Sequence, residues 1–202
     1  MADTFKTIDK AGNGIYKEKG SKFLSFAIPV TSIEEVKGII QEYKKTYFDA
    51  RHVCYAYMLG ANREEFRAND DGEPSGTAGK PILGQINSNE LTNILIIVVR
   101  YFGGVLLGTG GLITAYKEAA ADALNNCNVI EKIVKTEITL RFDYLLMNDI
   151  MGFCKLMNAE ITSQTFDNEC EIELLIPKSE TDMAKSRLEK MLIHSTFHVH
   201  IG

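Results

Sequence analysis

Three carboxylates lie close together in a segment that begins at Asp70 and reads DDGEPSGTAGKP, namely Asp70, Asp71 and Glu73. Such a group supplies enough oxygens to bind Mg²⁺ or Ca²⁺, or to take part in acid–base chemistry. The spacing is not that of an EF-hand, and Asp-Gly and Glu-Pro are ordinary turn dipeptides. We therefore expect the carboxylates to accept hydrogen bonds from turn N–H groups or to pair with Arg67 or Arg100, and we expect no bound metal and no cofactor.

Ser75 and His52 are residue types that can serve as a nucleophile and its base. The run GEPSG around Ser75 lacks the glycine two positions before the serine that a nucleophile elbow needs. We expect His52 to be a hydrogen-bonded histidine in the core or at its rim, and Cys54 to be buried on the same strand. The four cysteines form no C-x-x-C pair, which argues against a zinc site and predicts reduced thiols.

A second unusual segment begins at Arg100 and reads RYFGGVLLGTGGLITAY. Nine of the 16 glycines of the chain lie between Gly72 and Gly111, and such clustering predicts tight backbone geometry. The segment joins a buried strand to a helix, and a helix N-terminus binds anions through free N–H groups and the helix dipole. A phosphate or carboxylate near Thr109 is one interpretation. A tight turn with close helix–sheet packing is the one we favour, because the glycines follow neither nucleotide-binding pattern.

Composition and charge exclude several classes of protein. The chain has 202 residues, of which 45% are hydrophobic and 24% charged, as in an average soluble protein. Its net charge of -5 and pI of about 5.5 are unlike those of a protein that neutralises nucleic-acid phosphates, and we expect no DNA partner. The longest apolar run, 94–99, is far shorter than the roughly 20 residues of a membrane span. The N-terminus lacks a signal pattern, so we expect a cytoplasmic protein that does not enter a membrane.

Hydrophobic periodicity predicts strands and helices in the first part of the chain. The expected elements are two extended stretches within 15–30, a helix over 33–47 capped by Ser32, strands at 52–59 and 94–99, and a helix from Thr109 to Asn125. Residues 69–80 are too rich in glycine, proline and aspartate for a regular element. These elements predict an α+β sandwich as the first domain, residues 1–132.

The second part has a different order of elements. We expect a strand at 135–142, a helix over 146–157, strands at 160–166 and 169–176, a helix over 179–192 and a last strand at 196–201. This βαββαβ order fits a ferredoxin-like sandwich of one antiparallel sheet and two helices. The sequence thus predicts an α+β protein of two domains, the second being residues 133–202.

The two glycine-rich segments together resemble the signature of the IMPACT/YigZ family. The blocks HVCYAY from His52 and SKF from Ser21 match its flanking regions, and the likeness covers residues 15–125. The resemblance implies that the first domain has the fold of the second domain of a small-subunit ribosomal protein, shared with domain IV of elongation factor G. It also implies that the second domain is similar to the last domain of that factor.

The resemblance has implications for function. Eukaryotic members of the family restrain the starvation-response kinase that phosphorylates a translation initiation factor, by competing for the kinase's activator. For bacterial members the resemblance implies a translation-linked or RNA-binding regulator without an established reaction. Positions 106 and 114 often hold a basic residue in bacterial members, whereas Leu106 and Thr114 stand here. This difference leaves Arg100 and Lys117 as the cations of the glycine-rich segment.

Our first hypothesis is a non-enzymatic cytoplasmic regulator that binds the ribosome, RNA or a translation-associated protein through both segments. The second is an enzyme or small-molecule binder that uses the acidic loop and a phosphate-binding helix N-terminus. The third is that the signature specifies only a fold and a domain interface. The candidate binding residues are Asp70, Asp71, Gly72, Glu73, Ser75, Thr77, Arg100, Tyr101, Gly103, Gly104, Gly108, Thr109, Gly110 and Gly111, supported by His52 and Lys117.

Overall fold

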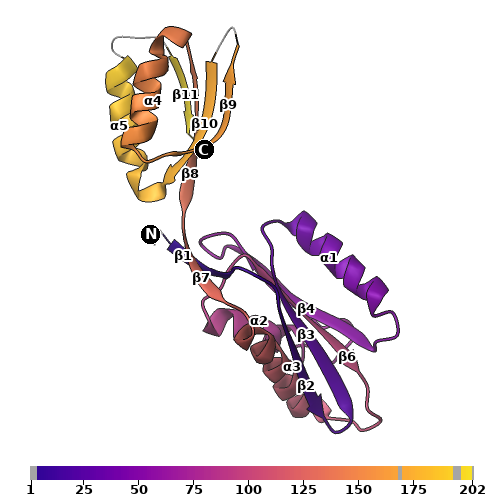
Figure 1. The fold of residues 1–202 in the computed structure, drawn as a ribbon. Coiled ribbons are helices and arrows are strands. Elements are labelled where there is room, and N and C mark those ends of the chain that lie inside the picture. The colour runs from indigo at the N-terminus through magenta and orange to yellow at the C-terminus, as the bar shows by residue number, and fades with distance from the viewer. Residues whose placement is uncertain (1–3, 168–169, 193–196, 202) are drawn as a thin grey trace. The chain divides into compact units, whose positions relative to one another are not determined.

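The fold is described from a computed structural model, which covers residues 4–167, 170–192 and 197–201. Contacts within the chain divide it into two units, one of Phe5–Lys132 and one formed by Thr4 together with the described residues from Ile133 onward. Both units combine strands with helices (Figure 1). The α+β class predicted from the sequence is confirmed.

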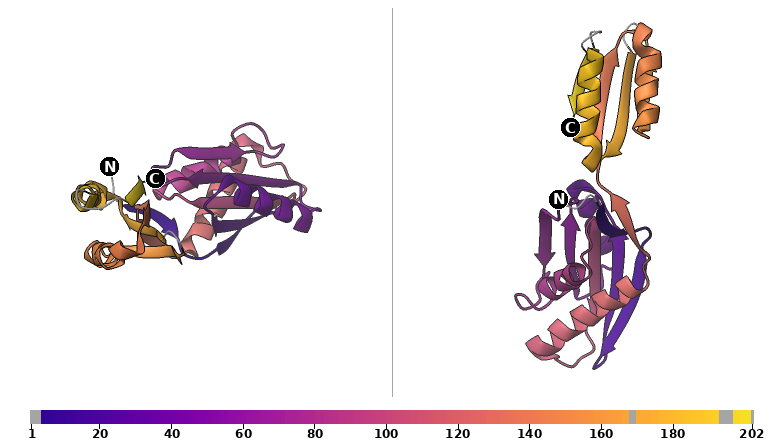
Figure 2. Two further views of the ribbon diagram at one scale, coloured as in Figure 1. Left: turned by 90° about the horizontal axis from the view of Figure 1, so that it is seen from above. Right: turned by 90° about the vertical axis from the view of Figure 1, so that its left-hand side faces the viewer.

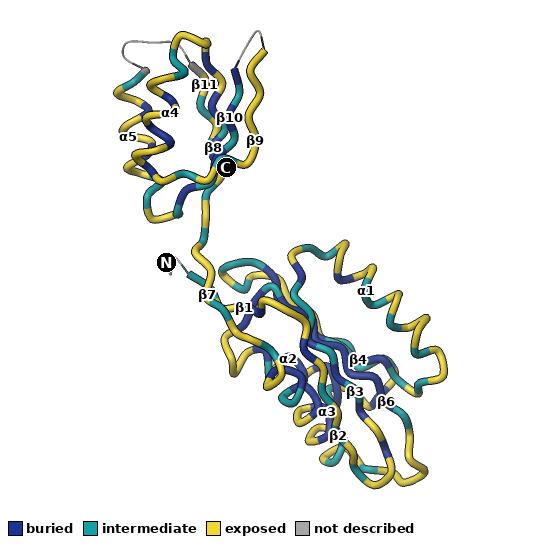
Figure 3. Tube along the Cα trace, in the orientation of Figure 1, coloured by how far each residue is buried: buried dark blue, intermediate teal, exposed yellow. Residues whose placement is uncertain are grey.

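The first unit is built on a five-stranded antiparallel sheet. In the order in which they lie in the sheet, its strands are β2 (Gly12–Glu18), β3 (Ser21–Pro29), β6 (Ile94–Tyr101), β4 (His52–Leu59) and β5 (Glu65–Asn69). The central strand β6 is buried from Ile94 to Arg100 (Figure 3). Its continuous β-branched and apolar run suits a strand covered on both faces.

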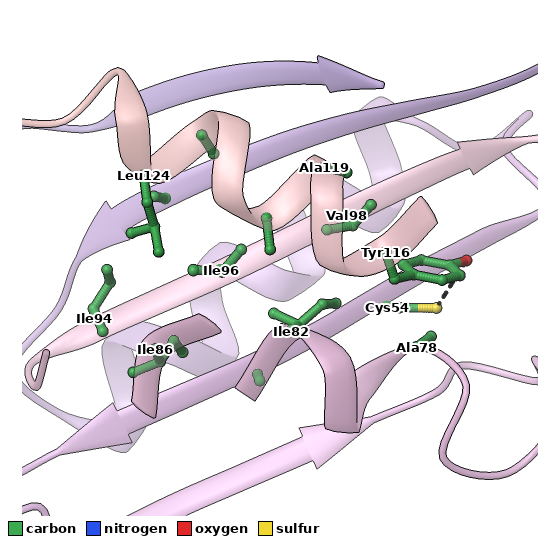
Figure 4. Close-up of a cluster of buried hydrophobic side chains, with 14 of the residues drawn as sticks. Cys54, Ala78, Ile82, Ile86, Ile94, Ile96, Val98, Tyr116, Ala119 and Leu124 are labelled. Carbon is green, nitrogen blue, oxygen red and sulfur yellow. Dashed lines mark hydrogen bonds between the residues drawn. The ribbon is translucent and has the colours of Figure 1, made fainter. Parts of the chain in front are cut away.

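Helices cover both faces of this sheet (Figure 1). On one face α1 (Ile33–Thr46) packs against Val53, Leu95 and their neighbours, and Ser32 caps its start by accepting a hydrogen bond from Glu35 N. On the other face lie α2 (Gly79–Ser88) and α3 (Gly108–Asn125). Their small and aliphatic side chains close the core over the sheet (Figure 4). Period-two alternation in the strands sends consecutive residues to opposite layers.

The second unit has the βαββαβ order that its periodicity predicts. Its elements are β8 (Lys135–Phe142), α4 (Met147–Leu156), β9 (Glu160–Phe166), β10 (Cys170–Pro177), α5 (Thr181–Leu192) and β11 (Phe197–Ile201), with 3-10 turns at Tyr144–Leu146 and Lys178–Glu180. The antiparallel sheet runs β11-β8-β10-β9, which is the split βαβ arrangement of a ferredoxin-like sandwich. Both helices pack on one face of it (Figure 2).

Some elements differ from the predictions. β1 (Thr4–Ile8) and β7 (Val129–Ile133) form a small separate sheet, and β5 was not predicted. These strands have only five residues each, and nearly all of β5 and β7 is exposed, so no long or buried apolar run marks them in the sequence. α2 was also missed, because glycine and proline in its first turn hide the helical pattern. The predicted strand residues 169 and 196 lie outside the described residues.

Candidate functional site

Asp70 organises the acidic segment as the cap of a helix. Helix α2 begins after Ala78, which has no side-chain group to cap it. The Asp70 carboxylate takes that role, accepting hydrogen bonds from the backbone N–H groups of Gly76 at 2.8 Å, Ala78 at 3.0 Å and Gly79 at 2.8 Å. Burial alone would raise the pKa of Asp70, but these three hydrogen bonds outweigh it and lower the pKa. This carboxylate therefore folds the segment.

Asp71 links the same segment to strand β4 and helix α1 by hydrogen bonds. Its Oδ2 accepts a hydrogen bond from Val53 N at 2.7 Å, and its Oδ1 from Lys44 Nζ at 2.6 Å. Its backbone is left-handed, with φ of 45°, and Gly72 follows with φ of 87°. The Asp71 carbonyl lies 2.8 Å from His52 Nδ1, which makes His52 a hydrogen-bonded rim histidine as predicted.

Glu73 is a buried carboxylate between a cation and a phenol. Its Oε1 accepts hydrogen bonds from Arg100 Nη1 at 2.6 Å and from the Tyr116 hydroxyl at 2.7 Å. Its Oε2 lies 3.8 Å from His52 Nε2. The sheet register explains the meeting, because His52 of β4 stands opposite Arg100 of β6. The predicted pairing of the acidic segment with Arg100 is thus made by Glu73.

Arg100 is 5% exposed, which is unusual for an arginine. Its guanidinium carbon lies 5.5 Å from the centre of the Phe23 ring and 5.7 Å from that of Phe102, within cation–π range. Glu73 accepts a hydrogen bond from Nη1 of this guanidinium. The buried Nε has no acceptor among the described residues.

These residues border a cavity of about 510 Å³, which we call the Arg100 cavity. Its lining residues are Arg51, His52, Glu73, Pro74, Arg100, Phe102, Leu106, Leu107, Gly108, Thr109 and Leu112. The wall is mainly apolar, with a few converging polar groups, as in sites for small ligands. Both sequence segments contribute to it, and so does the start of α3.

The glycine-rich segment bends sharply before α3. A side chain at Gly103 would overlap the backbone of Gly20 and Ser21, and Gly104 has φ of 86°. The following residues carry exposed apolar side chains, with Val105 52% and Leu106 83% exposed. Helix α3 then begins at Gly108 with no side-chain cap and no acidic residue in its first turn. The segment is therefore both a tight turn and an open helix N-terminus.

The remaining candidates lie around this centre in different roles. Thr77 is buried and donates to the Pro74 carbonyl at 2.6 Å, and the Tyr101 hydroxyl donates to Asp49 at 2.9 Å. Ser75 is exposed, as is Lys117, which is not among the lining residues. Gly110 and Gly111 stand in the first turn of α3. Within the described part of the chain, no group of His, Cys, Asp and Glu residues is arranged to hold a metal ion.

The candidate residues chosen from the sequence omit several contributors to this site. Arg51 and Phe102 are sequence neighbours of the candidates His52 and Tyr101. Nothing in the spacing of these residues predicts that they line a cavity. Tyr116 lies within the helix expected from Thr109 to Asn125 and was not a candidate, although its hydroxyl reaches Glu73. Leu106 lies within the glycine-rich segment of the first hypothesis, but it was not one of the candidate binding residues.

Cys54 borders the buried end of this network. Its thiol donates to the Asp70 carbonyl at 3.0 Å and lies 3.4 Å from the Tyr116 hydroxyl (Figure 4). Burial raises the pKa of Cys54, so the thiol stays protonated. The predicted burial is confirmed, and the thiol acts as a hydrogen-bonding core group.

The fold and the site define a two-unit α+β protein with a preformed, arginine-centred cavity beside an exposed glycine-rich loop. No described helix is long and apolar enough to cross a membrane. Residues 19–124 match the Impact N-terminal domain. "IMPACT family member YvyE" of Bacillus subtilis is 32% identical over 90% of this chain and 84% of its own. The chain belongs to the IMPACT family.

Two further similarities differ in how much of the chain they cover. The "Protein IMPACT homolog" of Dictyostelium discoideum is 38% identical over 96 residues, which are 45% of this chain and 27% of that protein. A crystal structure of a hypothetical protein aligns over 98% of this chain and 97% of its own, with 27% identity and a TM-score of 0.76. The solved structure therefore shares the fold of both units, whereas the eukaryotic match is much shorter.

Proposed function

We propose that this protein is a non-enzymatic cytoplasmic regulator that binds a component of the translation machinery. The docking loop would be residues 102–107, held in place by the acidic segment. Membership of the IMPACT family supports this proposal, because the sequence resembles members that act on translation. The observation that carries it is the exposure of Leu106, which is 83% accessible beside the buried Arg100–Glu73 pair.

The chemistry of the loop favours a protein surface as the contact. Phe102, Val105 and Leu106 are apolar and at least 48% exposed, so each leaves apolar area for a partner to cover. A ribosomal protein or a translation-associated factor offers such an area. Binding to an RNA backbone would instead need a cluster of cationic side chains.

The acidic segment supports a binding role over acid–base catalysis. Asp70, Asp71 and Glu73 each accept hydrogen bonds that fold the segment or pair Arg100. Carboxylates engaged in this way hold the loops in one conformation before a partner arrives. A pre-organised surface loses little conformational entropy on binding.

Sedimentation of the tagged chain in cell lysate, at low and at high salt, tests the proposal. We expect part of the wild-type protein to migrate with ribosomal subunits or a translation factor. Leu106→Ala should lose most of this association, and Phe66→Ala should keep it, because Phe66 is 60% exposed on β5, opposite Met58 near the far end of β4. Migration as a free small protein under all conditions contradicts the proposal. Association that only RNA removal abolishes would assign the contact to RNA.

A further inference from the structure

We propose that the Arg100 cavity binds a small molecule that carries a phosphate monoester and an apolar body. This inference goes beyond the proposed docking of a partner and does not depend on it. It rests on three features of the cavity lining, namely the buried cation Arg100, the uncapped start of α3 and an apolar wall.

The charges around the cavity favour an anion. Arg100 lines the cavity and is paired at Nη1 by Glu73, so this buried pair is neutral. The Nε group of Arg100 still has no acceptor among the described residues, and an unsatisfied buried donor is costly. Arg51 adds an exposed positive charge at the same wall.

The start of α3 adds a second set of donors. Gly108 and Thr109 line the cavity, and no side chain caps the helix there. The first N–H groups of an α-helix lack partners within the helix, and its dipole places partial positive charge at that end. Phosphate oxygens are well suited to such a cluster of N–H groups.

Gly110 in the first turn of α3 has no steric reason to be glycine. A Cβ at this position would meet no atom within 4 Å, and its φ is not positive. Glycine costs a helix up to about 1 kcal/mol relative to alanine. Gly110 is not among the residues that line the cavity, but its N–H belongs to the free donors at the start of α3, and the lack of a side chain leaves this helix end open to a tetrahedral anion.

The apolar part of the cavity wall favours a ligand with an apolar body. Pro74, Phe102, Leu106, Leu107 and Leu112 surround the polar groups with apolar surface. Phe102 is 48% exposed, so part of its ring is open to contact. The volume of about 510 Å³ lies within the range of small-molecule sites. Inorganic phosphate would fill only the polar end.

Amide NMR titrations of the full chain test the proposal with inorganic phosphate and with phenyl phosphate, against chloride at matched ionic strength. We expect saturable shifts of the Gly108, Gly110 and Gly111 amides and of the Arg100 Nε–H. Phenyl phosphate should bind at least about tenfold more tightly than inorganic phosphate, because its ring covers the apolar wall. The proposal is overturned if the amides at the start of α3 show no saturable shifts. It is also overturned if the amides at the start of α1 shift equally.

Variants separate this site from general anion effects. Thr109→Glu places a negative charge at the start of α3, which favours the helix dipole but repels phosphate. It should fold normally and lose about tenfold or more in affinity, whereas Lys117→Glu on the same helix should change affinity by less than about twofold. Equal losses in both variants contradict the site. Binding of a phosphoserine peptide without binding of phenyl phosphate would overturn the small-molecule assignment.

A glycine pair gives an independent measurement. Gly110→Ala and Gly84→Ala both fill open space in a helix, so both should raise stability modestly. Only Gly110→Ala should weaken phenyl phosphate binding. If both variants bind as well as the wild type, the backbone at Gly110 does not contact the ligand and the proposed anion site is wrong.

Discussion

The carboxylates and cations of the candidate site contact partners that lie far away in the sequence. Glu73 meets Arg100 and Tyr116, which lie 27 and 43 positions later in the chain. Their residue types were recognisable from the sequence, and the pairing of the acidic segment with Arg100 was one of two stated alternatives. The contact with the Tyr116 phenol was not predictable, because it depends on the placement of α3 over the sheet.

Replacing Glu73 tests the buried pair. Glu73→Gln leaves the Arg100 charge 5% exposed and without its carboxylate, so we expect a loss of about 3 kcal/mol in the free energy of unfolding. Tyr116→Phe removes a hydrogen bond to the same oxygen and should cost about 1–2 kcal/mol. Urea denaturation of the two single variants and the double variant measures both losses. Strictly additive losses would contradict a shared network.

Asp70 gives a pH-dependent prediction. Because its pKa is lowered in the folded state, its carboxylate contributes stability that is complete above the unfolded pKa and is lost as the pH falls below about 4. Asp70→Asn should therefore be less stable than the wild type by about 2 kcal/mol at pH 7. The difference should shrink in acid. Glu42→Gln, on the exposed face of α1, is the control, and a pH-independent difference for Asp70→Asn would contradict this role.

At the scale of elements, the long periodic segments were predictable and the short ones were not. Strands β4, β8 and β9 match the expected bounds because apolar or β-prone residues define them. α2 takes its cap from Asp70, eight residues before Ala78, and a local pattern does not contain that signal. The glycine-rich segment was predictable as a turn, but which glycines need to be glycine depends on what lies against them.

Two adjacent glycines should respond differently to alanine. Gly103→Ala forces a Cβ into the backbone of Gly20 and Ser21, and we expect a loss of at least about 3 kcal/mol or failure to fold. Gly104→Ala meets no atom within 4 Å but requires a left-handed φ of 86°, so it should cost only about 1 kcal/mol. Thermal unfolding compares them, and equal losses would contradict the close approach of Gly103.

At the scale of the whole chain, each unit has its own core. The first unit buries two clusters, one on each face of its sheet, and the second buries one between its sheet and α4 and α5. The order of the expected elements changes to βαββαβ in the second part of the chain. This order forms a complete sandwich by itself, and the sequence therefore predicted two domains. The function of the surface was not predictable at this scale, since many activities share one fold.

We propose 1–132 and 133–202 as domains that fold independently. Each fragment should show a single cooperative urea transition, and the shorter one should be the less stable because small domains bury less of their surface. Circular dichroism and tyrosine fluorescence follow the transitions. A first fragment that unfolds without cooperativity would place the boundary elsewhere.

The central claim is that the loop around Leu106 contacts the translation machinery. A photo-crosslinking amino acid at position 106, compared in cells with one at position 66, tests it most directly, because both side chains are exposed and only position 106 borders the cavity. We predict crosslinks from position 106 to a ribosomal protein or translation factor and none of these from position 66. The same crosslinks from both positions, or none from position 106, would contradict the account.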